Sequence, residues 1–167
     1  ERFPEIAEAA RLLPDGTVLD GEILPWRDDA PLPFAQLQRR IGRTKLGPKI
    51  LSEVPVVLVA YDLLEHAGAD VRTQPFSWRR DTLVELLEDV RGTDRFLVSP
   101  VVTAASWEEL QREQARARDE CAEGLMLKRR DAPYGVGRRR GPWWKWKVDP
   151  YTADAVLIYA QPGSGRR

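Results

Sequence analysis

The stretch Trp143-Trp144-Lys145-Trp146-Lys147 places large aromatic rings and two cations at alternating positions. A period of two predicts a β-strand, with both lysines on one face and Trp144 and Trp146 on the other. Two neighbouring ammonium groups repel each other unless an anion lies between them. The stretch therefore indicates either an anion-binding face or a wet, basic surface strand, and taken alone it does not separate the two.

The choice of lysine at both positions is unusual for this chain. Only five of its 26 basic residues are lysines, so chance would place lysine at both positions in about one case in 25. An ammonium acts as a compact point charge, whereas a guanidinium is a planar fork. The composition therefore favours a ligand that needs a point charge.

Three further polar patterns lie in predicted strands. Asp20-Gly21-Glu22, within a predicted strand over Thr17–Leu24, puts two carboxylates on one face, and the glycine lets another group approach the backbone. Such a pair suits a divalent cation or a sugar hydroxyl. Glu123-Gly124 repeats this theme, and Tyr61-Asp62 places a charge inside the apolar run Val54–Leu64, where it needs a partner. Each pattern also occurs on strands without a ligand.

The remaining periodicity predicts a mixed fold. Helices are predicted over Pro4–Leu13, Phe34–Ile41, Trp78–Val90, and from a Ser106/Glu109 capping box to about Ala117. Strands are predicted over Val54–Leu64, Leu125–Lys128, Trp143–Val148 and Ala155–Tyr159. Because strands and helices do not alternate regularly, we expect an α+β fold with antiparallel sheets flanked by helices.

Composition narrows the class of protein. The 167 residues suit one domain or two small lobes, and 43% hydrophobic with 31% charged residues is typical of a globular chain. The longest apolar run is too short to span a bilayer. One cysteine, Cys121, excludes an internal disulfide and, with the single His66, makes a zinc site or a Cys–His nucleophile a poor hypothesis.

Charge is unevenly placed in a chain whose formal net charge is zero. Between Cys121 and Pro150 there are eight basic residues and three acidic ones, a local excess of five positive charges. Such a stretch can contact phosphates, although a solvated loop would explain Arg138–Arg140 on their own.

The order and spacing of these patterns carry a resemblance. The four segments look like nucleotidyltransferase motifs III, IIIa, IV and V of the superfamily of ATP-dependent DNA ligases, RNA ligases and mRNA capping enzymes. They are Leu19–Ile23, Tyr61–Leu64, Glu123–Lys128 and Lys145–Lys147. Two intervening segments, Pro33–Arg40 and Tyr134–Arg140, are similar to DNA ligases in particular, most of all to the bacterial ATP-dependent type. The resemblance implies the ligase/capping-enzyme nucleotidyltransferase fold, which is ATP-grasp-like.

The resemblance also implies a nucleotide site. Tyr61 would stack on the adenine of ATP, and Glu22 would hold the ribose hydroxyls or orient the metal, supported by Asp20 from the same face. Glu123, with Asp20, would bind Mg²⁺ or Mn²⁺. Lys145 and Lys147 would contact the α-phosphate and, with Glu22, carry the catalysis. Lys128, followed by two arginines, is expected outside the phosphate shell.

The implied substrate is nicked duplex DNA. Candidates for its backbone are Arg39, Arg40, Arg138, Arg139 and Arg140. The protein is expected to seal nicks through enzyme-AMP and DNA-adenylate intermediates, as a monomer in the bacterial cytoplasm. An RNA ligase or capping enzyme is the related alternative. A non-catalytic nucleic-acid-binding module, with Trp143, Trp144 and Trp146 as stacking platforms, is the unrelated one.

One family motif has no counterpart in the chain. The family's nucleophile is the lysine of Lys-x-Asp-Gly, and none of the five lysines is followed by x-Asp-Gly. We therefore expect this motif to lie upstream of Glu1, in a missing N-terminal segment. Residues 1–150 are expected to be a partial adenylation domain, and residues 151–167 the start of a truncated OB-fold domain or a linker.

Overall fold

The computed structural model describes residues 2–43, 45–90, 92–137 and 140–163. In chain order its elements are α1 (Pro4–Ala9), the 3₁₀ turn η1 (Ala10–Leu12), β1 (Val18–Arg27), β2 (Ala30–Pro31), α2 (Phe34–Ile41), α3 (Pro48–Glu53), β3 (Val56–His66), β4 (Ala69–Asp70), α4 (Phe76–Asp89), β5 (Phe96–Val98), α5 (Trp107–Arg116), β6 (Gly124–Lys128) and β7 (Trp143–Lys147).

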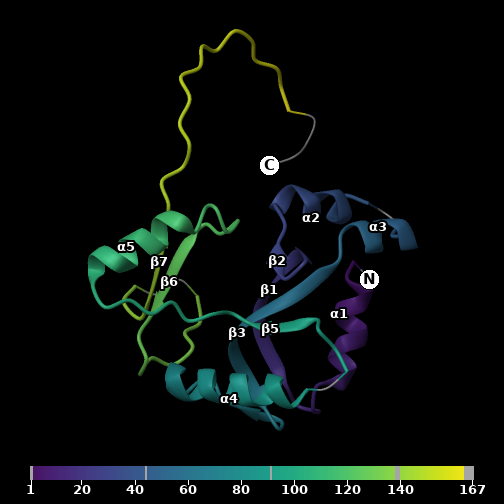
Figure 1. Ribbon diagram of the computed structural model, residues 1–167, viewed down its shortest axis with the longest axis vertical. Coiled ribbons are helices and arrows are strands. Elements are labelled where there is room, and N and C mark those ends of the chain that lie inside the picture. Colours follow the sequence, from purple (N-terminus) through teal and green to yellow (C-terminus); the bar gives the residue numbers. More distant parts are fainter. Residues whose placement is uncertain (1, 44, 91, 138–139, 164–167) are drawn as a thin grey trace.

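The strands form two separate sheets. The larger one has the order β2-β1-β3-β4, and β5 pairs with β3 in parallel. The smaller one is the antiparallel pair of β6 and β7. In Figure 1 the small sheet and α5 lie on the left, α1, α2 and α3 lie beside the large sheet on the right, and α4 lies below. The expected α+β fold with antiparallel sheets is confirmed, with β5 as the parallel exception.

The core forms where α4 packs on β3. Ala60 and Leu63 of β3 are fully buried against Leu83 and Leu86 of α4, with Val71 completing the cluster. Spacing of three residues keeps both leucines on one face of the helix, and the β-branched, apolar sequence of β3 suits a strand covered on both sides. This packing anchors the large sheet, which carries polar residues at its surface.

Most predicted elements are present. The helix predicted over Phe34–Ile41 has those bounds, and the other predicted helices differ by a few residues at their ends. At the start of α5, the Glu109 amide donates to Ser106 Oγ at 3.2 Å, while the Glu109 carboxylate accepts from the Ala105 amide at 2.7 Å. The predicted cap is confirmed in this slightly shifted form. Helix α3 and the short strands β2, β4 and β5 were not predicted.

The strand predicted over Ala155–Tyr159 is wrong. These residues carry no helix or strand, and Val156 to Tyr159 are 74–91% exposed. An unpaired strand leaves its backbone N–H and C=O groups without partners, so a short apolar run is not enough to form one. Separately, none of the helices in the described part of the chain is long and apolar enough to cross a membrane.

Candidate functional site

A bulge between β1 and β3 positions the first group of predicted site residues. Asp20 pairs with Asp62, but the next residue, Gly21, pairs with Ala60, so Tyr61 has no residue directly opposite it. Bulges bend a strand, re-aim side chains and are frequent next to functional sites. Here the extra residue is the aromatic ring that the sequence marks as a candidate ligand platform.

Two glycines of the predicted motifs allow strands to approach closely. A Cβ on Gly21 would lie 2.7 Å from the carbonyl oxygen of Val59 in β3. Gly124 has φ +136°, and a Cβ there would lie 2.1 Å from the carbonyl oxygen of Trp146. The sequence suggested that another group approaches the backbone at Gly21. That group is the neighbouring strand, so both glycines hold the site strands together.

Carboxylates and tyrosines gather beside the bulge. The Tyr134 hydroxyl donates to Asp20 Oδ2 at 2.7 Å. Burial, followed by this hydrogen bond, raises the pKa of Tyr134 to about 12. Burial and the charges of Asp20 and Glu22 also raise the pKa of Tyr61. The structure therefore brings Tyr61 near Asp20 and Glu22, and it extends the range in which both tyrosines keep their protons above their ordinary pKa of 10.

The two predicted lysines line a hollow on one face of β6 and β7. Lys145 lies opposite Met126 and Lys147 opposite Gly124. Together with Gly135, Gly137, Pro142 and Trp143, these lysines and Met126 line a cavity of about 480 Å³. On the other face Trp146 packs near Trp107 of α5, with ring centroids 6.4 Å apart. The predicted alternation of lysines and tryptophans is confirmed.

Glu123 lies beside this hollow. Its carboxylate is 2.6 Å from the Lys147 ammonium, and the two side chains are 78% and 56% exposed. The hydrogen bond and the charge of Lys147 lower the pKa of Glu123. Because exposed ion pairs contribute little stability, an anionic ligand can displace one partner at small cost.

Lys128 joins the two groups of residues. Its ammonium lies 5.0 Å from the centroid of the Tyr61 ring, 4.1 Å from that of Trp143 and 3.5 Å from a carboxylate oxygen of Asp62. The side chain is only 9% exposed. Burial lowers the pKa of Lys128, although Asp62 opposes this shift. The sequence led us to expect Lys128 only outside the phosphate shell; the structure adds that its ammonium lies near both the Tyr61 ring and Trp143, which lines the lysine hollow.

The charge inside β3 has the partner that the sequence required. Asp62 is fully buried, and Arg79 of α4, equally buried, donates to both of its carboxylate oxygens at 2.6 and 3.1 Å. A buried carboxylate is tolerated when it is paired and hydrogen-bonded, as here.

The predicted DNA-binding arginines differ in their surroundings. Arg39 is 48% exposed, with Glu53 at 2.8 Å, and Arg140 is exposed. Arg40 is fully buried, 2.5 Å from Glu5, and donates to backbone carbonyls, so the prediction that Arg40 contacts DNA is wrong. It faces the core because it lies one helical turn from the buried Leu37. The predictions for Arg138 and Arg139 fall outside the described residues.

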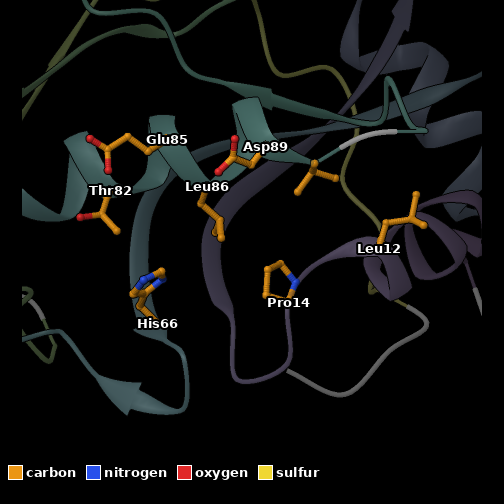
Figure 2. Close-up of a pocket in the computed structure, with 8 residues that line it drawn as sticks. Leu12, Pro14, His66, Thr82, Glu85, Leu86 and Asp89 are labelled. Atoms are coloured by element: carbon orange, nitrogen blue, oxygen red, sulfur yellow. The ribbon is translucent and has the colours of Figure 1, made fainter.

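A second hollow lies away from all of these residues. Figure 2 shows it between the start of β1, the end of β3 and α4, with a cavity volume of about 430 Å³. Its lining comprises Leu12, Pro14, His66, Thr82, Glu85, Leu86, Asp89 and Val90. It contains none of the predicted site residues.

Within the described ranges, no group of three or more His, Cys, Asp or Glu side chains gathers as metal ligands. Mg²⁺ is commonly held by one or two carboxylates together with substrate phosphates. Glu123 beside the lysine hollow is compatible with that kind of site, and Asp20, which accepts one hydrogen bond through Oδ2, is a second candidate.

An aromatic ring with two carboxylates nearby and a hollow lined by two lysines is the kind of residue set that suits a nucleotide. The family model described as "ATP dependent DNA ligase domain" matches residues 1–147. The chain therefore belongs to the ATP-dependent DNA ligase domain family. This match favours DNA ligases over the RNA ligases and capping enzymes that share the four motifs.

Known proteins agree with this assignment. The chain is 38% identical to a DNA ligase of Haloferax volcanii, over 100% of its own length and 28% of the relative's. It is 41% identical to a probable DNA ligase of an Anaeromyxobacter species, over 98% and 31% of the two lengths. The chain thus spans less than a third of these two relatives. A solved mycobacterial DNA ligase D, complexed with ATP and MES, aligns with a TM-score of 0.64 and 28% identity over 87% of this chain and 42% of that one.

Proposed function

We propose that this chain binds the AMP portion of ATP for a DNA ligase that seals nicks in duplex DNA. The observation that carries the proposal is the position of the Lys128 ammonium, which lies 5.0 Å from the centroid of the Tyr61 ring and 4.1 Å from that of Trp143, a residue that lines the lysine hollow. An adenine ring stacks on the tyrosine while its α-phosphate takes the position between Lys145 and Lys147. The ligand therefore supplies the anion that two adjacent lysines need.

The carboxylates have separate roles in this proposal. Glu22 is exposed on the strand that also carries Asp20, so it can accept hydrogen bonds from the ribose hydroxyls. Glu123 would hold Mg²⁺ at the phosphates, with Asp20 as a second oxygen donor. When bound, Mg²⁺ neutralises phosphate charge during transfer of the adenylyl group. Release of Glu123 from Lys147 would free both side chains for the phosphate and its metal.

The proposed reaction of the whole protein has three steps. AMP is transferred from ATP to the enzyme with release of pyrophosphate, then from the enzyme to the 5′-phosphate of the nick, and the 3′-hydroxyl finally displaces AMP. In each step Lys145 and Lys147 would stabilise negative charge as the phosphorus becomes five-coordinate. The exposed Arg39 and Arg140 are the described candidates for the DNA backbone.

Binding of AMP and sealing of a nick test the proposal separately. AMP titrated into the chain should quench the tryptophan fluorescence, because Trp143 lines the lysine hollow. A form of the protein that also carries a Lys-x-Asp-Gly segment should seal a nicked DNA duplex in the presence of ATP and Mg²⁺. Failure of AMP and ATP to bind would contradict the proposed site, and sealing of nicked RNA in preference to DNA would contradict the proposed substrate.

A further inference from the structure

The two halves of the proposed site lie on different sheets. Tyr61 and Glu22 belong to the large sheet, whereas Lys145 and Lys147 belong to the small one, and no strand pairing joins the two sheets in the described part of the chain. Side chains, together with the segments that link the sheets, therefore set the distance between the tyrosine ring and the lysines, and one of these segments is residues 129–134, which follow β6.

Arg79 of α4 lies where these parts meet. Its Nε and Nη2 donate to the two carboxylate oxygens of Asp62 in β3, and its Nη1 donates to the carbonyl oxygens of Ala132, at 3.2 Å, and Gln74. All three nitrogens are thus engaged in a side chain with no exposed surface. One guanidinium connects the large sheet, the residues that follow the small sheet's first strand, and the turn before α4.

The same residues are fixed to the first turn of α4. The amide of Phe76 donates to the Ala132 carbonyl at 2.9 Å, and the amide of Ser77 donates to the Arg130 carbonyl at 2.8 Å. Amides in the first turn of a helix have no partner inside the helix, so these carbonyls act as its cap. Arg79 and the cap together hold residues 130–132 against α4.

Asp62 carries this constraint to both halves of the site. It is the neighbour of Tyr61 in β3, and its Oδ2 lies 3.5 Å from the Lys128 ammonium. Lys128 pairs with Trp143 across β6 and β7, two residues before Lys145. Asp62, which Arg79 holds, therefore adjoins Tyr61 in the large sheet. Its carboxylate also contacts Lys128, which belongs to the small sheet.

We propose that Arg79 is a positioning residue, which sets the separation between the adenine platform at Tyr61 and the phosphate-binding lysines without touching the ligand. The inference rests on the proposed function of the site. A planar fork with three engaged nitrogens fixes orientation as well as charge, which a point charge could not do. Loss of Arg79 should then harm a ligand that spans both halves more than a ligand that uses only one.

The test compares adenosine with AMP in the chain. Adenosine uses the platform alone, whereas AMP also uses the lysines, so the ratio of their dissociation constants reports how well the two halves are aligned. We expect Arg79→Gln to lower the preference for AMP over adenosine by about tenfold or more, since small misplacements of bound groups have effects of this size. The matched control is Arg72→Gln, which removes an exposed arginine paired with Asp70 and should keep the parent ratio.

A second variant guards against simple unfolding. Arg79→Gln leaves the Asp62 charge buried without its main partner, whereas Arg79→Lys keeps a cation beside Asp62 but lacks the planar fork that fixes orientation. Both variants are measured well below their thermal unfolding midpoints. A merely structural role would lower the midpoint and leave the ratio unchanged in the folded protein, and that result would overturn the inference. A parent chain that does not prefer AMP over adenosine would instead overturn the proposed function, and this inference with it.

Discussion

The ammonium of Lys147 lies 2.6 Å from the carboxylate of Glu123, so the chain itself supplies an anion to one of its two paired lysines. Both side chains are more than half exposed, and such pairs contribute little to stability. The pair can therefore open at small cost, as the proposed binding of the α-phosphate requires. This arrangement offsets part of the repulsion between the two lysines at alternate positions of one strand.

Replacement of either lysine by arginine tests the need for a compact charge. Lys145→Arg and Lys147→Arg keep the positive charge but put a longer, planar group into the hollow. We expect each to slow AMP transfer by two to three orders of magnitude, equivalent to about 3–4 kcal/mol, the usual effect of losing one contact to a transferring group. The measurement is single-turnover AMP transfer in a form of the protein that carries a Lys-x-Asp-Gly segment.

The control must be an exposed lysine. Lys49, at 90% exposure near Glu53, meets this condition, and Lys49→Arg should transfer AMP at the parent rate. Lys128 does not, because arginine would have to fit among three aromatic rings and Asp62. If both site variants stay within a few-fold of Lys49→Arg, the two lysines are not phosphate ligands.

Tyr61 tests the adenine platform. Tyr61→Ala should weaken ATP binding by about 1–3 kcal/mol, the scale of one base–aromatic stack. Tyr61→Phe should bind nearly as well as the parent, since the ring face and not the hydroxyl contacts the base. Isothermal titration with ATP measures both. Equal losses of ATP affinity in the two variants would show that the hydroxyl, and not the ring face, contacts the nucleotide, and would contradict the stacking role.

The sequence predicted the placement of the candidate site residues that lie on strands better than that of the arginines that lie on helices. A strand's period of two placed Lys145 with Lys147 and Asp20 with Glu22 on common faces without knowledge of the tertiary structure. The close grouping of Tyr61 with both carboxylates was not predictable from periodicity, because it depends on a bulge. The aromatic surroundings of Lys128 were not predictable for a similar reason, since its aromatic neighbours come from three separate elements.

Arg40 was assigned the wrong role and Arg79 was given none, although the sequence contained a signal for both buried arginines. Arg79 stands four residues before the buried Leu83, and Arg40 three residues after the buried Leu37, so each lies on the apolar stripe of its helix. An arginine at such a position needs a buried carboxylate, and Asp62 was already marked as an acid without a partner. The pairing itself, 17 residues apart along the chain, required the fold.

The hydrogen bond from Tyr134 to Asp20 predicts a stability change at alkaline pH. The pKa of Tyr134 is raised to about 12 from its ordinary value of 10, so the folded chain keeps this proton after the unfolded chain has lost it. The resulting stabilisation is complete below pH 10 and is lost as the pH rises toward 12. Unfolding by urea between pH 9 and 12 should show this loss in the parent and a smaller one in Tyr134→Phe. Identical pH profiles would contradict it.

The 167 residues alone should not form a covalent adenylate. They contain no Lys-x-Asp-Gly, the motif whose lysine attacks ATP in the family. Incubation with α-labelled ATP and Mg²⁺, followed by denaturation, should leave the chain unlabelled even though it binds the nucleotide. A stable label mapped to any of its five lysines would refute this expectation.

Arg39 and Arg40 are neighbours in the sequence, but their substitution should have different effects. Replacement of Arg39 should affect DNA binding, whereas replacement of Arg40 should affect stability. The side chain of Arg39 is half exposed, so Arg39→Gln should preserve the fold, weaken binding of nicked duplex DNA and reduce the salt slope of that binding by about one. Arg40 is fully buried against Glu5 and also donates to the carbonyls of Arg2 and Val54. Arg40→Gln should therefore lower the free energy of unfolding by about 3–5 kcal/mol, the usual effect of breaking a buried pair.

Acid titration gives Arg40 a second signature. Burial by itself would raise the pKa of Glu5, but the hydrogen bond and charge of Arg40 lower it overall. The stability that Glu5 contributes is therefore present above its ordinary pKa of 4.5 and is lost as the pH falls below that value. In Arg40→Gln this acid-side loss should shrink, whereas Arg39→Gln should keep the parent profile. Urea unfolding at pH 3 to 6 measures the difference. A stable, folded Arg40→Gln with weaker DNA binding and the parent acid profile would return Arg40 to the DNA-binding surface.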